Sequence, residues 1–358
     1  MPSGHPAGTG ECDRPGEYGD GKSRPSIGGP GNRGTGQSGT GQSGDRDGRV
    51  VHPGPAVGAS LLSAPMDISM TLPTMLPHGR REVLSWCRQV DDGPWTSLAV
   101  PERVTFTSHA LTVQLAAAAA LTERVRLWTT LVVLPAHNAV QVAKDMASVD
   151  RLSDGRLTVG VGVGGRRQDF EAIGGDFGHR WQRMDEQVAT MRRIWAQEPP
   201  FEGSDPVGPP PVQVGGPPLV AGVMGPKALA RAAQWAVGVD DPTSITDVVG
   251  ESLSAQRSRV VEAWKDAGRD EPPHFSTSLW YALGPGARER LEAYVFEYMK
   301  IFDPSFARTL AESAAVTTPE ALRHAIDVAR DVGCDEFFLV PTTADPAELD
   351  RTREALGL

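Results

Sequence analysis

Three side chains able to carry protons follow two short apolar segments of the chain. Glu102 and His109 come after Ser97–Pro101, and His137 comes after Val125–Leu134. Glutamate and histidine are among the side chains most used for general acid–base catalysis, and burial raises the pKa of a carboxyl toward neutral pH. The pattern predicts Glu102 as a proton carrier, with the two histidines assisting. The alternatives are a solvated loop carboxylate and polar residues that begin helices.

A second group of residues has the pattern of an anion site. Gly222 and Gly225 precede Pro226 and Lys227, where a helical pattern begins. Proline suits the first turn of a helix, the free backbone N–H groups there attract anions, and lysine adds positive charge. We expect a phosphate group to bind at these residues. The alternative, which the spacing alone favours, is an ordinary strand-to-helix turn.

Glycines also close the apolar run Leu157–Val163, where Gly162, Val163 and Gly164 follow one another. This is not a dinucleotide-binding fingerprint, because the required acidic residue on a following strand is missing. Glycines at a strand end can instead let a planar ring approach the backbone closely. Thr129 is predicted to end the preceding strand at the same edge of the sheet, with a plain strand-forming role as the alternative.

Short apolar, β-branched runs alternate with longer helical patterns over residues 66–358. Strands are predicted near Asp67–Leu72, Ser97–Pro101, Val125–Leu134, Leu157–Val163, Leu219–Val223, Ala236–Val239, Phe275–Leu283 and Glu336–Pro341. Helices are predicted near Arg80–Gln89, Ser108–Leu121, Ala139–Arg151, Arg180–Gln197, Pro226–Trp235, Ser252–Ala267, Ala287–Ile301, Pro319–Val332 and Pro346–Leu356. About eight strand–helix units favour an α/β fold of the (β/α)₈ TIM-barrel type over a doubly wound sheet. In such a barrel, functional residues lie at the carboxyl ends of the strands.

The composition of the chain disfavours several classes of function. A net charge of −10 and a pI near 5.3 argue against nucleic-acid binding, which needs a basic surface to displace counterions. No apolar stretch reaches the roughly 18 residues that span a bilayer, and no signal peptide is visible, so we expect a cytoplasmic protein without a membrane partner. Cys12, Cys87 and Cys334 are widely separated, and no metal site is expected.

Residues 1–65 differ in composition from the rest of the chain. They hold 17 of the 40 glycines and almost no large apolar side chains. Such a segment cannot bury enough surface to offset the entropy lost on ordering, so we predict that it is a disordered extension and that the domain spans residues 66–358. The abrupt change at Met66 leads to the hypothesis that translation starts there, which mass spectrometry of the native N-terminus would test.

Several motifs follow one another in a specific order along the predicted barrel. They are Arg-Val-Arg-Leu-Trp-Thr-Thr at 124–130, Val-Gln-Val-Ala-Lys at 140–144, Leu-Ser-Asp-Gly-Arg at 152–156 and Gly-Val-Gly-Val-Gly at 160–164. Arg180, Glu186 and Trp195 continue the series with an R-x₅-E-x₈-W helix, and residues 334–341 form its last strand. This order of elements resembles the luciferase-like monooxygenase family over most of residues 66–358.

The resemblance implies a flavin- or deazaflavin-dependent oxidoreductase, with FMN or the deazaflavin F420 as cofactor and NAD(P)H as a reductant. Its reaction would transfer hydride or electrons between the cofactor and a small organic substrate or oxygen. The resemblance also implies that Glu102 and Thr129 contact the cofactor ring, and that the glycine turn at 222–227 holds its phosphate. A homodimer is a further expectation from the family.

The chain departs from the family pattern at Arg103, where the family often has a histidine after an acidic residue. The segment of residues 198–218 is also short compared with the family pattern and is rich in proline. Two other functions stay open: a flavin-binding barrel protein without turnover, and a non-redox barrel lyase or isomerase. The second is disfavoured because Schiff-base chemistry needs a lysine at a strand end, whereas the lysines here lie in helical patterns.

Overall fold

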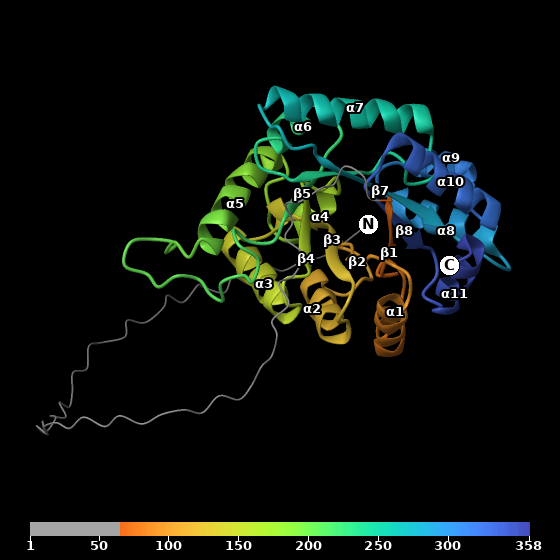
Figure 1. Ribbon diagram of the computed structural model, residues 1–358, viewed down its shortest axis with the longest axis horizontal. Coiled ribbons are helices and arrows are strands. Elements are labelled where there is room, and N and C mark those ends of the chain that lie inside the picture. The colour runs from red at the N-terminus through yellow and green to blue at the C-terminus, as the bar shows by residue number, and fades with distance from the viewer. Residues whose placement is uncertain (1–64) are drawn as a thin grey trace, which may run out of the picture. The chain divides into compact units, whose positions relative to one another are not determined.

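The computed structural model describes residues 65–358, which form a closed barrel of eight parallel strands (Figure 1). Each strand pairs with the next one in the sequence, and β8 pairs with β1 to close the barrel. The strands are β1 (Asp67–Thr71), β2 (Ser97–Val100), β3 (Arg126–Val133), β4 (Leu157–Gly162), β5 (Leu219–Gly222), β6 (Gly238–Asp241), β7 (His274–Tyr281) and β8 (Glu336–Pro341). The predicted TIM barrel is confirmed.

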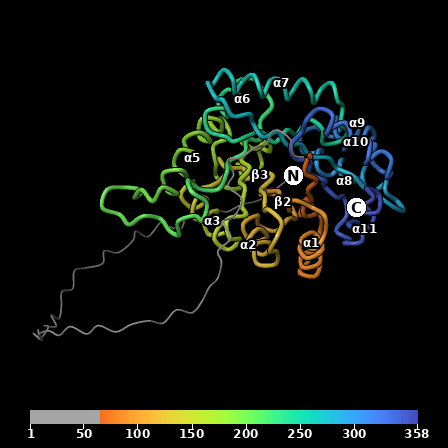
Figure 2. The backbone as a smooth tube through the Cα atoms, in the orientation of Figure 1, coloured from red at the N-terminus to blue at the C-terminus, as the bar shows by residue number. Residues whose placement is uncertain are grey.

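Helices alternate with the strands, and the chain winds once around the barrel so that its first and last units meet (Figure 2). Trp86 in the first helix donates a hydrogen bond across this seam to the carbonyl oxygen of Ala344, at 2.9 Å. The helices are α1 (Arg80–Asp92), α2 (Leu111–Leu121), η1 (Leu134–Ala136), α3 (Ala139–Leu152), α4 (Arg167–Ala172), α5 (Arg180–Trp195), α6 (Pro226–Ala232), α7 (Gly250–Asp266), α8 (Ala287–Met299), α9 (Pro304–Ser313), α10 (Pro319–Val332) and α11 (Ala347–Leu356).

Alternate residues of the strands face the interior of the barrel, where they form a small core of their own. Ala99, Trp128, Val220 and Phe338 pack there as one buried cluster. The rings of Trp128 and Phe338 lie 5.2 Å apart, and since β3 and β8 are not neighbours, this contact crosses the barrel interior. The other face of the sheet packs against the helices in the main hydrophobic core. Both faces of each strand are therefore buried, which explains the continuous apolar runs of the sequence.

Two helix starts are capped by polar side chains. The Thr318 side chain accepts a hydrogen bond from the Ala321 N–H at 3.2 Å at the start of α10. Asp345 accepts from the Ala347 N–H at 3.1 Å where α11 begins. In both cases a side-chain oxygen satisfies one of the backbone donors that the first turn leaves unpaired.

The predicted order of elements needs three corrections. The sixth strand runs over Gly238–Asp241 rather than Ala236–Val239, because Asp240 and Asp241 are buried within the strand and a polar pair reads as its end. Helix α9 lies between two predicted helices, where no element was predicted, and Asp303 before it accepts a hydrogen bond from the Phe306 N–H at 2.6 Å. The short helix α4 follows the glycines that end β4, and no helix was predicted there.

The Leu-Ser-Asp-Gly-Arg motif and the buried acid before it have a structural role. Asp150 accepts hydrogen bonds from the backbone N–H groups of Val212 and Gln213 at 2.7 and 3.0 Å. Arg156 donates to the backbone carbonyl oxygens of Val125 and Thr122, each at 2.7 Å. The first pair anchors the long connection between α5 and β5, the green loop that projects in Figure 1, and the second joins β4 to the start of β3.

Residues 1–64 lie outside the described part of the chain. The predicted disordered extension falls in that segment, and the proposed translation start at Met66 stays a prediction. Within residues 65–358, no helix combines the length and the apolar character needed to cross a membrane.

Candidate active site

Glu102 and His137, predicted from two different segments, lie together at the carboxyl end of β2 and β3. His137 Nε2 is 2.9 Å from Glu102 Oε1, and the other carboxylate oxygen accepts a hydrogen bond from the Val133 N–H at 2.6 Å. Both oxygens of Glu102 are thus held, and its side chain is only 10% exposed. The backbone bond fixes the carboxylate, and the carboxylate orients the imidazole, which is the arrangement of an oriented acid–base pair.

The environment of His137 favours its protonated form. Burial alone lowers the pKa of His137, but the hydrogen bond and negative charge of Glu102, together with the charge of Asp145, outweigh burial and raise that pKa. The imidazole is still 34% exposed, so protons can reach it. The pair therefore keeps a proton available over a wider pH range than a free histidine would.

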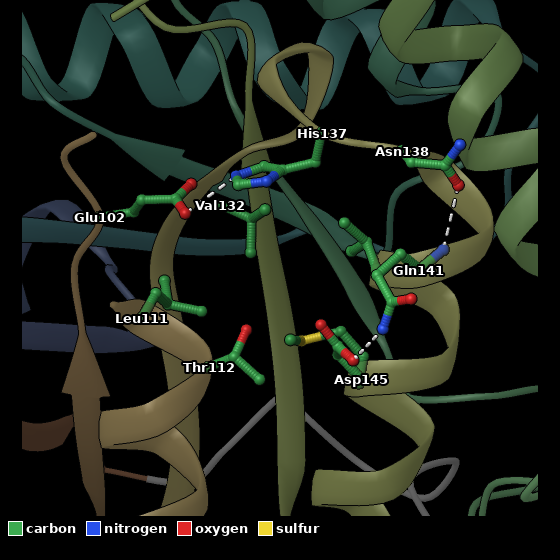
Figure 3. A pocket seen from close by; sticks show the side chains of 10 residues that line it. Glu102, Leu111, Thr112, Val132, His137, Asn138, Gln141 and Asp145 are labelled. Carbon is green, nitrogen blue, oxygen red and sulfur yellow. Dashed lines mark hydrogen bonds and ion pairs between the residues drawn. The ribbon is translucent and has the colours of Figure 1, made fainter. Parts of the chain in front are cut away.

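The Glu102–His137 pair borders a cavity of about 120 Å³ between the first turns of α2 and α3 (Figure 3). In the close-up the two side chains point toward one another at the top of the cavity, while Thr112 and Asp145 lie along its lower part. The lining residues are Glu102, Leu111, Thr112, Val132, His137, Asn138, Gln141, Val142, Asp145 and Met146. A space of this size admits a few water molecules or a small polar group.

His109, the other predicted proton carrier, contacts different residues. Its ring packs edge-on against His78 with the centroids 4.8 Å apart, and its Nε2 lies 3.3 Å from the His78 carbonyl oxygen. The residue is exposed just before α2. The structure therefore brings Glu102 together with His137 and leaves His109 with His78.

Thr129 and Val163 are buried in the barrel wall rather than presented at its mouth. The Thr129 hydroxyl donates a hydrogen bond to the Gly160 carbonyl oxygen at 2.7 Å, which links β3 to β4. Val163 is 8% exposed and belongs to the main hydrophobic core. In the second half of β3 the half-exposed residues are instead Thr130 and Leu131, at the point where the register between β3 and β4 shifts. Sequence reasoning missed these two because the shift does not show in the periodicity.

Leu131 explains the glycines that end β4 and β5. A Cβ atom on Gly222 would lie 1.9 Å from the Leu131 Cδ1 atom, and one on Gly162 would lie 3.0 Å from it. A Cβ atom on Gly160 would lie 2.6 Å from Cδ2 of the same side chain. The three glycines thus leave room for the Leu131 side chain, which forms an apolar ledge at the mouth of the barrel.

The predicted phosphate-binding turn at residues 222–227 has open space around it. Gly225 caps α6 in extended backbone geometry, and no atom would come within 4 Å of a Cβ placed on it. Pro226 begins the helix and Lys227 is exposed beside it. Gly164, also predicted to contact the cofactor, has φ +68 and accepts a hydrogen bond from Arg180 Nε at 3.2 Å through its carbonyl oxygen.

Asp240 is a carboxyl of the barrel interior that sequence reasoning missed. It is 7% exposed and accepts a hydrogen bond from the Ser276 hydroxyl at 2.9 Å. Burial raises the pKa of Asp240 to about 6, with Ser276 opposing the shift and the charges of Asp241 and Glu336 adding to it. The only sequence signal was the acidic pair after an apolar run, which resembles a solvated strand end.

We expect Asp240→Asn to stabilise the protein above pH 6. The pKa of Asp240 is raised from 3.8 to about 6, so the stability that depends on the neutral carboxyl is complete below pH 3.8 and is lost as the pH rises through about 6. At roughly 1.4 kcal/mol for each pKa unit, the charged form costs on the order of 3 kcal/mol of folding free energy. Asparagine keeps an oxygen for Ser276 without this charge.

Urea denaturation of the wild type and the variant across pH 4–8 measures this difference. The gain in unfolding free energy should grow up to about pH 6 and then level off. Asp247→Asn, at an exposed acid, should change the free energy by less than about 0.5 kcal/mol at every pH. An Asp240→Asn variant less stable than the wild type at pH 8 would show that the charge is compensated.

Two arginines, Arg103 and Arg166, lie near one another at the barrel mouth, which was not predicted from the sequence. Arg103 follows Glu102, and its guanidinium lies 4.3 Å from the centroid of the Tyr298 ring on α8. Arg166 is 4% exposed and lies 3.5 Å from the buried carboxylate of Asp169. Burial by itself raises the pKa of Asp169, but hydrogen bonds from Thr105 and the two arginines outweigh it and lower that pKa. A charged cluster therefore joins the loops after β2 and β4.

Comparison with known proteins identifies the family of this barrel. The family model described as luciferase-like monooxygenase matches residues 63–357, which includes all eight strands. The chain belongs to the luciferase-like monooxygenase family. After β2 this chain carries Glu102, followed by Arg103.

Individual relatives match this luciferase-like barrel at modest identity. An uncharacterized protein of Mycobacterium tuberculosis is 38% identical over 86 residues, which cover 24% of this chain and 30% of the relative. The chain therefore aligns with less than a third of that curated relative. Among solved structures, the monooxygenase RslO1 from Streptomyces bottropensis is 25% identical with a TM-score of 0.66, over 81% of this chain and 97% of the other. An F420-dependent secondary alcohol dehydrogenase in complex with an F420-acetone adduct is 19% identical with a TM-score of 0.67, over 81% and 98%.

Proposed function

We propose that this protein is a flavin- or deazaflavin-dependent oxidoreductase of the luciferase-like type. It would transfer hydride or electrons between its cofactor and a small organic substrate or oxygen. The observation that carries the proposal is the oriented Glu102–His137 pair at the end of the barrel where such enzymes place their chemistry. Family membership supports the redox assignment, and NAD(P)H as reductant and a homodimer stay predictions.

The residues at the barrel mouth fit a flat conjugated cofactor such as FMN or F420. Leu131 offers an apolar ledge above the glycines of β4 and β5. The Gly222–Lys227 turn offers backbone N–H groups and one lysine for a phosphate group. When bound, the cofactor would supply the electron or hydride acceptor that none of the protein's side chains can provide.

The protein's own residues would manage protons and position. Glu102 holds the imidazole of His137 with one carboxylate oxygen while the other is fixed by the Val133 N–H. His137, protonated over a wider pH range because of Glu102, would give a proton to an oxygen atom that becomes negatively charged during the reaction.

The spectrum and mass of any small molecule released by heating the purified full chain would test this function. We expect FMN or F420, or micromolar binding when either is added to the purified protein. Turnover is then measured by oxidation of NAD(P)H or reduction of F420 with small alcohols. A bound cofactor without any turnover would favour the flavin-binding barrel protein, and no cofactor binding would favour the non-redox lyase or isomerase.

We expect Lys227→Glu to weaken cofactor binding roughly threefold to tenfold, because it places a negative charge where the cofactor phosphate is proposed to bind. Dissociation constants from fluorescence titration measure the effect. Lys265→Glu, at an exposed lysine of α7, makes the same change in net charge and should leave the constant unaltered. Equal affinities for the wild type and both variants would remove the phosphate assignment.

A further inference from the structure

A half-exposed arginine and a set of aromatic rings meet where the loop after β2 approaches α8. Arg103 lies over the ring of Tyr298, and its Nη2 donates a hydrogen bond to the Tyr298 hydroxyl. Trp280 contacts Tyr298 edge-on at 4.8 Å, Tyr294 stacks parallel to Tyr298 at 6.2 Å, and Phe106 lies 6.5 Å from the same ring. We call Arg103, Phe106, Trp280, Tyr294 and Tyr298 the Arg103 cluster.

The positive charge of the Arg103 cluster is not balanced by its surroundings. Arg103 and Arg166 both approach Asp169, which supplies a single negative charge. Glu102 is already bonded to His137, and burial raises the pKa of Tyr294, so that this phenol stays neutral. Burial and the charge of Arg166 lower the pKa of Arg103 to about 10, which still leaves it protonated at neutral pH. One positive charge therefore lacks a counterion of its own among the described residues.

Arg103 also has an unused hydrogen-bond donor. Its Nε is enclosed and, within residues 65–358, has no hydrogen-bond partner. A buried charged donor without an acceptor costs free energy, so such groups are paired in folded proteins or kept for a ligand. The guanidinium presents Nε and the amino groups in a planar fork that matches the oxygens of a carboxylate.

The aromatic members determine what kind of molecule could bring the anion. Trp280 and Tyr294 are buried, whereas Phe106, Tyr298 and Arg103 are half-exposed, so the cluster is open to solvent on one side. Flat aromatic walls favour a planar conjugated ligand through edge and stacking contacts. The Tyr298 hydroxyl that now accepts from Arg103 could be exchanged for a stronger, charged acceptor.

We propose that the Arg103 cluster binds the anionic oxygen of a planar aromatic substrate, a carboxylate or a phenolate. The proposal assigns a substrate class to the proposed oxidoreductase. It rests on that function only because it calls the ligand a substrate. A phosphate of the cofactor is the other source of anionic oxygen, and the experiment below separates the two. Arg103 would then be a specificity-determining residue that positions the substrate beside the Glu102–His137 pair.

Calorimetric titration of the purified full chain with 2-naphthoate and with 2-naphthamide tests the proposal. The two probes share one shape and differ in charge. We expect the wild type to bind 2-naphthoate at least tenfold more tightly, since a charge-assisted hydrogen bond in a buried site is worth about that much. Arg103→Met should abolish the preference and leave 2-naphthamide binding within about twofold. Arg103→Lys should keep part of the preference, because it keeps the charge but loses the fork.

Arg81→Met is the matched control, because Arg81 is 92% exposed and its salt bridge is to the adjacent Glu82. It should bind both probes like the wild type. Equal affinity of the wild type for the two probes, or an unchanged preference in Arg103→Lys and Arg103→Met, would overturn the proposal. If Arg103→Met fails to fold, the wild-type comparison and Arg103→Lys still decide.

Titration in the presence of inorganic phosphate distinguishes a substrate site from a site for the cofactor phosphate. We expect phosphate to leave 2-naphthoate binding unchanged at concentrations up to about a hundred times that of the naphthoate. Competition between the two that disappears in Arg103→Met would assign the anion site to the cofactor phosphate and overturn the substrate assignment. Cofactor binding, followed by its visible spectrum in the same variants, is a separate readout. Its absence in the wild type alongside a naphthoate preference would refute the oxidoreductase function but not the anion site.

Discussion

Replacing Glu102 with glutamine is expected to lower turnover roughly 100-fold while cofactor binding changes little. Glutamine has nearly the same shape but no charge, so it cannot hold His137 in its protonated form. The pKa of His137 should fall, because the hydrogen bond and charge of Glu102 are what raise it against burial. Loss of one general acid–base group typically lowers the rate 10²–10⁴-fold. We expect the lower end of this range, because the imidazole of His137 would still transfer some protons after rotating away from residue 102.

Steady-state kinetics across pH 5–9 and NMR titration of the histidine rings measure these two effects. The limb of the pH–rate profile that reports His137 should move to lower pH in Glu102→Gln. Asp145→Asn is the matched control, because Asp145 lines the same cavity and acts on His137 through charge without contacting its ring. It should alter turnover less than about threefold. Kinetics of Glu102→Gln equal to those of the wild type would reduce Glu102 to a scaffold residue.

Gly160→Ala is expected to lower the free energy of unfolding by roughly 3 kcal/mol or more. The new Cβ atom would lie 2.3 Å from the carbonyl oxygen of Thr129 on the neighbouring strand. That oxygen belongs to the backbone of a paired strand and cannot move without breaking the sheet. Urea denaturation of the wild type and the variant measures the loss.

Two further variants separate a backbone clash from a side-chain clash. At Gly222 the three atoms nearest to the added Cβ all belong to the Leu131 side chain, the first at 1.9 Å, so Leu131→Ala should restore most of the stability lost in Gly222→Ala. The same Leu131→Ala change should not rescue Gly160→Ala. Gly225→Ala, where no atom lies within 4 Å of the new Cβ, is the control and should cost less than about 1 kcal/mol. Rescue of Gly160→Ala by Leu131→Ala would show that the Thr129 carbonyl is not the obstacle.

The fold was predictable because the barrel repeats one local pattern. Strands with two buried faces read as apolar runs, and the helices carry local start signals such as Thr318. The errors came where chemistry and secondary structure conflict. Asp240 continues a strand because the neighbouring strand supplies Ser276 as its partner, whereas Asp241 is bonded locally by Thr243, two residues further on. Helix α9 was missed even though Asp303 and Pro304 form the same kind of start signal.

The candidate site was only partly predictable. Glu102 and His137 were identified separately, but nothing in the sequence shows that His137 rather than His109 reaches Glu102. The packing around the glycines was unpredictable for a similar reason. Gly162 was predicted to let a cofactor ring approach and Gly222 to lie in a phosphate-binding turn. The structure adds that both glycines leave room for Leu131, whose position depends on the register shift in β3.

Local pattern alone was thus sufficient for the eight strand–helix units and for the residue types at the carboxyl ends of the strands. These depend on side-chain periodicity and capping, which are short-range. The pairing of Glu102 with His137, the burial of Asp240 and the placing of Arg103 against Tyr298 came only with the folded barrel. Each joins residues from separate strand–helix units, and the distances, burial and charge that set their chemistry exist only once the chain has closed.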